Sequence, residues 1–293
     1  MHEDIVLRGG RLAVAIKHPA AVGGARFDRT GFVTEATLDG RHTFGAYEIP
    51  HVWDPSKGAG LCGEFGNQRM LGYDEAKPGE WFPKLGVGLL RRESDEGYRF
   101  MKAYEVRPYR VDVIREDESR VLFDAHPEPC LGFAARYRKR LAIEGNALRA
   151  DYELTNVGER IIATNEYAHN FICIDGHTVG PDYSLVFRGE CQPAFAVHVG
   201  DIRAEGGRLA WGSVPDRDFY GRMAPGGDGG ALPDGWTLEH RPSGVRVSEA
   251  CGFRTELIAV WGMAHNVSPE MFAPVQAAPG ETATWSRTYT FEA

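Results

Sequence analysis

The chain has 293 residues, of which 43% are hydrophobic and 25% are charged, and its formal net charge at pH 7 is -8. This composition is typical of a soluble globular protein and excludes the disordered and fibrous classes. The negative charge and the scattered basic residues argue against a nucleic-acid partner, and no apolar run reaches the roughly 20 residues that a membrane helix needs.

The N-terminal segment, MHEDIVLRGGRLAV, carries acidic residues and glycines where a signal peptide would have an apolar core. We therefore expect a cytoplasmic protein, either a monomer or a homodimer. Free thiols fit that reducing compartment. The cysteines are widely spaced, and no two of them form the C-x-x-C motif that binds zinc or carries out thiol exchange. We therefore expect neither a metal nor a cofactor. The cysteines are Cys62, Cys130, Cys173, Cys191 and Cys251.

Segments with period-two alternation lie between frequent glycines and prolines along the whole chain, which predicts many strands and few helices. Residues 31–48, GFVTEATLDGRHTFGAYE, predict two strands around an Asp39-Gly40 turn. Residues 109–127 predict a hairpin that reverses at the acidic EDES. Residues 137–156 predict a second hairpin that turns at residues 144–146.

The second hairpin is expected to have one solvent-exposed face. Leu148, Ala150, Tyr152 and Leu154 point one way along its second strand, while polar residues alternate with them. The basic run ARYRKR, residues 135–140, is interpreted as a solvated edge.

The last third contains a glycine-rich segment at residues 224–236, APGGDGGALPDGW, which is either a mobile surface connection or a flap near a binding cleft. Beyond it, ETATWSRTYTFEA alternates and predicts a C-terminal strand. No shift in composition marks a linker. We therefore expect a single domain over residues 1–293.

Several catalytic signatures are absent. LGVGLLRR begins like a dinucleotide fingerprint at Gly86 and Gly88, but Arg91 replaces its third glycine. The sequence has no P-loop and no G-x-S-x-G elbow. With these motifs excluded, the sequence indicates a large β protein that has polar residues within otherwise apolar strands.

The segment TNEYAHNFICIDG, residues 164–176, shows this mixture most clearly. It reads as a buried strand, yet it carries Asn165, Glu166, His169 and Asn170. Burying an unpartnered polar group costs about 1–3 kcal/mol, so these side chains need partners or a cavity.

YELTNVGER at residues 152–160, followed by TNEYAHNFICIDG, resembles the aldose 1-epimerase (galactose mutarotase-like) family. In that family a Tyr-x-Leu-x-Asn-x-Gly strand end precedes a strand with His and an aromatic-Asn pair. GARFDRTG at residues 24–31, WFPKLGVGLL at residues 81–90 and the closing segment at residues 267–291 are also similar to the family. These landmarks span nearly the whole chain.

The resemblance implies an all-β fold, a large twisted antiparallel β-sandwich with the site in an open cleft on one sheet. It implies a carbohydrate epimerase that interconverts the α and β anomers of a sugar, with His169 as general acid and Glu270 as general base. His169 would then face the cleft while Phe171 helps to fill the interior. The Asn-rich His-Gly-Gly loop of the galactose-specific members is absent, so the resemblance does not extend to galactose specificity.

Further candidate residues surround this pair. Arg26 is expected to bind sugar hydroxyls, or else to form a salt bridge with Asp28 or another acid. Asn170, Lys84, Asp182 and Glu64 are further substrate-binding candidates, and Glu64 is also the alternative base. The aromatic candidates for stacking on a sugar, or else for core packing, are Trp81, Trp261 and Phe272.

Two other functions stay open at this point. One is a non-catalytic carbohydrate-binding or sensing protein on the same scaffold. The other is a lyase or isomerase that acts on an acidic sugar, which requires a cationic cleft. A phosphorylated sugar would need two or three convergent basic groups, and Arg26, Lys84 and Arg91 are the candidates.

Overall fold

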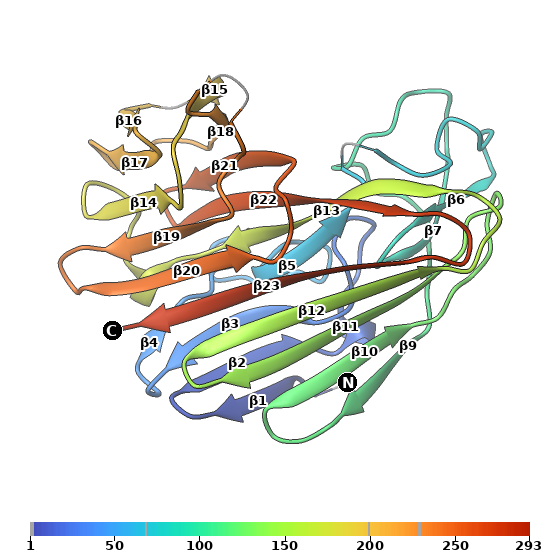
Figure 1. The fold of residues 1–293 in the computed structure, drawn as a ribbon, viewed down its shortest axis with the longest axis horizontal. Coiled ribbons are helices and arrows are strands. Elements are labelled where there is room, and N and C mark those ends of the chain that lie inside the picture. Colours follow the sequence, from blue (N-terminus) through green and yellow to red (C-terminus); the bar gives the residue numbers. More distant parts are fainter. Residues whose placement is uncertain (1–2, 68, 199, 228–229) are drawn as a thin grey trace.

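Two large antiparallel sheets pack face to face in the computed structural model of the protein (Figure 1). The structure describes residues 3–67, 69–198, 200–227 and 230–293. Residues 1–2 of the N-terminal segment and residues 228–229 of the predicted loop lie outside these ranges. The all-β sandwich predicted from the sequence is confirmed.

The first sheet has the strand order β1-β2-β3-β5-β13-β22-β21-β18-β15, with β4 paired to β3. Its strands are β1 (Ile5–Gly9), β2 (Leu12–Lys17), β3 (Phe32–Leu38), β4 (His42–Thr43), β5 (Gly60–Phe65), β13 (Ile162–Phe171), β15 (Cys191–His198), β18 (Phe219–Pro225), β21 (Leu257–Met263) and β22 (Asn266–Ala277). Strands from distant parts of the chain therefore meet at its centre.

The second sheet has the order β16-β17-β14-β19-β20-β23-β12-β11-β10-β9. Its strands are β9 (Val111–Arg115), β10 (Arg120–Ala125), β11 (Ala135–Glu144), β12 (Ala147–Asn156), β14 (Tyr183–Phe187), β16 (Ile202–Glu205), β17 (Arg208–Trp211), β19 (Gly235–His240), β20 (Val245–Cys251) and β23 (Thr282–Glu292).

A small third sheet forms a separate lobe beside the sandwich (Figure 1). It consists of β6 (Trp81–Lys84), β7 (Gly88–Arg91) and β8 (Val106–Pro108). The helical turns in the described part of the chain are two 3-10 turns, η1 (Pro19–Ala21) and η2 (Ile174–Gly176). No helix among the described residues is long and apolar enough to cross a membrane.

The predicted hairpins are confirmed. The solvent-exposed face of the second hairpin is the one predicted from the alternation of polar and apolar residues on β12. β11 and β12 turn at residues 145–146, and β9 and β10 turn at residues 116–119. The basic run on β11 is not an edge, however, because β11 lies between β10 and β12. Lys139 is buried within it and donates to the carbonyl oxygen of Thr30 at 3.1 Å. A strand with one face in the core must bury every second residue, basic or not.

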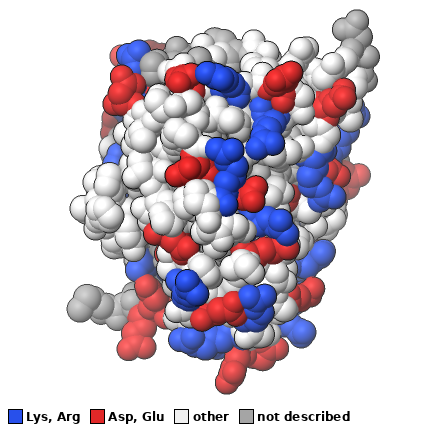
Figure 2. Space-filling view, turned by 90° about the vertical axis from the view of Figure 1, so that its left-hand side faces the viewer, with Lys and Arg blue, Asp and Glu red and all other residues white. Residues whose placement is uncertain are grey.

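The core fills the space between the two sheets. Phe65 of the first sheet meets Tyr137 of the second edge-to-face, with ring centroids 5.1 Å apart, and also contacts Trp285. The described cysteines are all free thiols, as expected. The end face of the molecule shows basic and acidic side chains interspersed, with no broad patch of one sign (Figure 2).

Candidate active site

Four neighbouring strands of the first sheet carry the candidate site on the sheet face that points away from the second sheet. On β13, Glu166 and Asn170 reach toward the second sheet, so strand alternation turns Tyr167, His169 and Phe171 outward. The strand register pairs Tyr167 with Phe272 and Ile172 with Val267, and continuing it sets His169 opposite Glu270. Side chains on this face form three rows, each of which crosses the strands in the order β5, β13, β22, β21. The top row is Glu64, Tyr167, Phe272 and Leu257, and the middle row is Cys62, His169, Glu270 and Ala259. The bottom row is Gly60, Phe171, Ser268 and Trp261.

The middle row holds the two predicted proton carriers side by side. His169 Nε2 lies 3.3 Å from Glu270 Oε1. Ser268 Oγ links them from the next row, at 2.9 Å from His169 Nδ1 and 3.2 Å from Glu270 Oε1. Only 6% of each of the two titratable side chains is exposed. The imidazole and the carboxyl thus form one nearly buried hydrogen-bonded unit.

Aromatic rings fix the imidazole in place. The His169 ring stacks on Phe171, and Trp261 and Phe27 meet it edge-on at centroid distances of 5.3 and 6.1 Å. The expectation that Phe171 fills the interior is wrong, since residues two apart on a regular strand share a face. Gly58 makes the packing possible, because a Cβ there would lie 2.0 Å from the Phe171 ring.

Burial shifts both His169 and Glu270 away from their charged forms. Burial raises the pKa of Glu270 to about 8, although the nearby Arg26 charge acts in the opposite direction. Burial and the same Arg26 charge lower the pKa of His169 well below its ordinary value. At neutral pH the carboxyl therefore holds a proton and the imidazole is neutral.

The carboxylate of Glu64 and its hydrogen-bond donors form a second polar group in the row next to this pair. Glu64 is fully buried and accepts from three side chains: from Arg26 at 2.9 Å, from Lys84 at 3.0 Å and from Tyr167 at 2.5 Å. Burial favours its neutral form, but the charges of Lys84 and Arg26 together hold the pKa of Glu64 below its ordinary value. A carboxylate committed to these three donors is a poor proton carrier.

The comparisons with known proteins agree with this architecture. No protein-family model and no curated protein matches the sequence. Among solved structures, a galactose mutarotase-like protein from Clostridium acetobutylicum matches with a TM-score of 0.62 at 11% identity, over 99% of this chain and 95% of that one. One from Lactobacillus casei matches with a TM-score of 0.59 at 12% identity, over 99% and 100% of the two chains.

The chain has the galactose mutarotase-like fold. A third match, a galactose mutarotase related enzyme from Lactobacillus acidophilus, has a TM-score of 0.59 at 11% identity and covers 99% of this chain and 98% of that one. At these identities the likeness concerns the fold. The chemistry has to be argued from this chain's own residues.

On this galactose mutarotase-like scaffold, two of the predicted substrate-binding residues lie away from the pair's face. Asn170 points into the space between the sheets, where Tyr289 donates to its Oδ1 at 3.0 Å. It follows His169 directly, so strand alternation turns it to the other side. Asp182 lies in the exposed turn before β14 of the second sheet, where its carbonyl oxygen accepts from the backbone of Arg241.

The other predicted side chains divide between the site and its surroundings. Lys84 reaches the Glu64 cluster but is fully buried, with Tyr98 OH at 2.9 Å. Arg91 pairs with the exposed Glu105. Of the aromatic candidates, Trp261 flanks His169, Phe272 stacks on Tyr167 in the core of this face, and Trp81 lies under Arg107 in the small lobe.

Sequence reasoning missed Ser268 and Tyr98. Ser268 stands two residues before Glu270, and on a strand that spacing puts both side chains on one face, so the signal was available. Tyr98 comes from a loop between β7 and β8, and nothing in its local pattern indicates a contact with Lys84.

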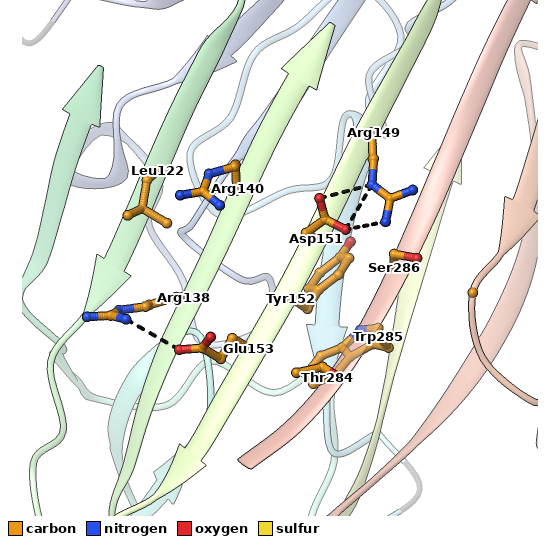
Figure 3. A pocket seen from close by; sticks show the side chains of 11 residues that line it. Leu122, Arg138, Arg140, Arg149, Asp151, Tyr152, Glu153, Thr284, Trp285 and Ser286 are labelled. Carbon is orange, nitrogen blue, oxygen red and sulfur yellow. Dashed lines mark hydrogen bonds and ion pairs between the residues drawn. The ribbon is translucent and has the colours of Figure 1, made fainter. Parts of the chain in front are cut away.

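A cavity of about 400 Å³ lies elsewhere, on the outer face of the second sheet (Figure 3). Its charged side chains are all ion-paired: Arg149 with Asp151, Arg138 with Glu153, and Arg140 with Glu116 outside the cavity. It shows the solvated face of β11 and β12 rather than a set of convergent catalytic groups. A smaller cavity of about 160 Å³ adjoins Arg26 itself, between residues 24–26, 56–57 and 100–103.

Proposed function

We propose that the protein is a carbohydrate epimerase of the mutarotase type, which interconverts the α and β anomers of an uncharged sugar. The observation that carries this proposal is the His169–Glu270 pair, an imidazole and a carboxyl 3.3 Å apart with opposed pKa shifts. Opposed shifts in a pair of titratable groups are typical of acid and base partners.

Mutarotation needs one group to protonate the ring oxygen and another to take the proton of the anomeric hydroxyl. Both oxygens are bonded to the anomeric carbon. Two neighbouring groups on one sheet face can therefore serve both oxygens of a sugar that lies over them. Each proton transfer of this kind typically contributes about 100- to 10,000-fold in rate.

At neutral pH the Glu270 carboxyl has a proton to donate, and the neutral imidazole of His169 has one unprotonated ring nitrogen that can accept a proton. Below about pH 8 the proton is on Glu270, because burial raises its pKa while it lowers that of His169. Glu270 then supplies the ring-oxygen proton and His169 accepts the hydroxyl proton, and the two exchange roles when the ring closes. This assignment reverses the roles that the family resemblance implies.

The charges around the pair support a neutral sugar. Of the three cations considered for a phosphate or carboxylate, Arg26 and Lys84 are both bound by Glu64, and Arg91 is paired on the surface. Lys84 is fully buried as well. Arg26 borders a cavity together with Lys57 and Lys102, but each of these three cations is already ion-paired within the protein, with Glu64, Glu48 and Glu93 respectively.

One observation favours a second candidate, a sugar-binding protein without catalysis on the same fold. Both ring nitrogens of His169 have partners within the protein, and the pair is barely exposed, as in a satisfied core histidine. Such a protein would bind sugars without accelerating anomer exchange.

Saturation-transfer NMR of a panel of aldoses, aldose phosphates and uronates decides between the two. The comparison uses wild type, His169→Ala, Glu270→Gln and, as a matched control, His240→Ala, since His240 is a buried histidine of the second sheet. We expect accelerated exchange of a neutral aldose that is lost in the two site variants and kept in the control. Binding without acceleration for every sugar would overturn the epimerase and favour the binding protein.

A further inference from the structure

The ladder of backbone hydrogen bonds between β13 and β22 is interrupted beside the His169–Glu270 pair. Paired residues run from Ile162–Ala277 to Tyr167–Phe272, and pairing resumes only at the single bridge between Ile172 and Val267. In that register Asn170 lies opposite Pro269. Proline has no N–H to donate, so the backbone bond of that position is missing.

Side chains hold the strands together across this gap. The backbone N–H of Asn170 donates to Ser268 Oγ at 2.9 Å instead of to a backbone carbonyl. The side-chain Nδ2 of Asn170 donates to the carbonyl oxygen of Pro269 at 2.6 Å. Both bonds lie next to the pair, because Asn170 adjoins His169 and Pro269 adjoins Glu270.

The second sheet holds Asn170 from behind. Its Oδ1 accepts from Tyr289 at 3.0 Å, and its Nδ2 also lies 3.3 Å from Glu249 Oε2. Glu249 accepts in turn from Trp236 at 2.7 Å and from Arg287 at 2.6 Å. All of these groups are buried, so the amide has one well-defined position.

Arg287 anchors the same two strands a step further along. It is fully buried between Glu249 and Glu166 of β13, and its Nη2 donates to the carbonyl oxygen of Met271 on β22 at 2.9 Å. A buried arginine with two carboxylates gains little net stability, because desolvation of the charges offsets their attraction, but its bonds fix the positions of the groups that it joins. Here that geometry is the spacing of β13 and β22 beside the pair.

We propose that Asn170, held by Glu249 and Tyr289, is a positioning residue that sets the His169–Glu270 distance by donating its side-chain amide to the Pro269 carbonyl where the backbone ladder is interrupted. Asn170 touches no substrate in this role. The proposal rests on the proposed function for its catalytic meaning. The positioning itself can be measured without turnover.

The test compares Asn170→Ala with Asn156→Ala. Asn156 is a matched control, since it is equally buried and also donates to a β22 carbonyl, that of Ala277 at 2.9 Å, but at the far end of the strand. The first readout is the titration of the Glu270 carboxyl, followed by carbon-13 NMR. The other charged and titratable groups that face or support the pair are the same in both variants: Arg26, Glu64 and Tyr167 on the site face, and Glu166, Glu249 and Arg287 on the interior side.

We expect Asn170→Ala to move the Glu270 midpoint by roughly half a pH unit or more. We also expect it to reduce kcat of anomer exchange about tenfold or more, with KM changed far less, because misplacing a proton carrier affects the chemical step. Asn156→Ala should lower the melting temperature and leave both readouts unchanged. Pro269→Ala in the Asn170→Ala background restores a backbone donor and should recover part of the midpoint shift.

An unchanged Glu270 midpoint in a folded Asn170→Ala protein would overturn the proposal. If that variant does not fold, Tyr289→Phe removes only the hydroxyl that holds the amide, and it should shift the midpoint in the same direction. No shift there would equally overturn the proposal. Failure of the epimerase is a separate result, since it abolishes the kcat difference in every variant and leaves the titration informative.

Discussion

The imidazole of His169 lies parallel to the ring of Phe171, with centroids 4.0 Å apart and planes inclined by 4°. This stack fixes the plane in which both ring nitrogens find their partners, Ser268 on one side and Glu270 on the other. The orientation of the His169 imidazole is thus set by its neighbour two positions along the strand.

Replacing Phe171 by leucine removes the flat surface and lets the imidazole rotate. We expect anomer exchange to fall about tenfold, because misorientation of a catalytic group raises the barrier. Stability should fall by about 1–2 kcal/mol. Phe187→Leu is the control, as Phe187 is also buried on a strand but belongs to the second sheet. Equal activity of the two variants would show that the stack does not orient His169. The ring-proton shifts of His169 report the same change without turnover.

Glu270 makes the stability of the protein depend on pH. Its pKa is about 8 in the folded protein against 4.5 ordinarily, because burial disfavours the carboxylate, so the folded state binds the proton more tightly. The resulting stabilisation is fully present below about pH 4.5, declines as the pH rises above it and is lost once the pH has risen through about 8. Glu270→Gln cannot ionise, and so it lacks this dependence.

We therefore expect wild type to lose stability relative to Glu270→Gln between about pH 4.5 and 8, by at most about 1.4 kcal/mol for each pH unit. Urea denaturation at several pH values measures the difference. A constant offset between the two proteins over this range would contradict the raised pKa.

The sequence predicted the strands well because most of them have one face in the core. Leu148, Tyr152 and Leu154 alternate with polar residues, and this period indicates both the strand and its buried side. The same reasoning misjudged Lys139, because a lysine on the inner face reads as a surface residue until Thr30 is known to accept from it.

Only those site residues could be predicted from the sequence that the family resemblance or the alternation of residues along a strand identifies. His169 and Glu270 were named from the resemblance, but their direct contact depends on the register between β13 and β22, which lie about a hundred residues apart in the chain. Asn170 was misplaced because its polarity suggested a ligand contact, whereas alternation turns it inward. The position of Tyr98 depends on a loop whose path no local pattern specifies.

The Glu64 cluster gives a prediction that is independent of any activity. Glu64→Gln leaves Arg26 and Lys84 beside each other without the carboxylate, and we expect a loss of about 3–5 kcal/mol, the usual result of breaking a buried ion pair. Adding Lys84→Met should recover part of the loss, because one uncompensated charge is then removed. Urea denaturation of the two single variants and the double variant gives the coupling energy. Additive losses would show that the two side chains do not interact.

Ser268→Ala tests the hydroxyl that joins the two proton carriers. It leaves the buried N–H of Asn170 without an acceptor, so we expect a loss of stability of about 1–3 kcal/mol. Ser184→Ala is the matched control, because the Ser184 hydroxyl is buried without a partner and its removal should cost far less. The hydrogen bond from Ser268 also lowers the pKa of Glu270, so the variant should hold its proton to higher pH. The alkaline limb of the activity profile should then move to higher pH in Ser268→Ala and stay in place in Ser184→Ala. A limb that does not move, in a folded variant, would mean that the hydroxyl has no influence on the carboxyl, and that the serine serves β13 alone.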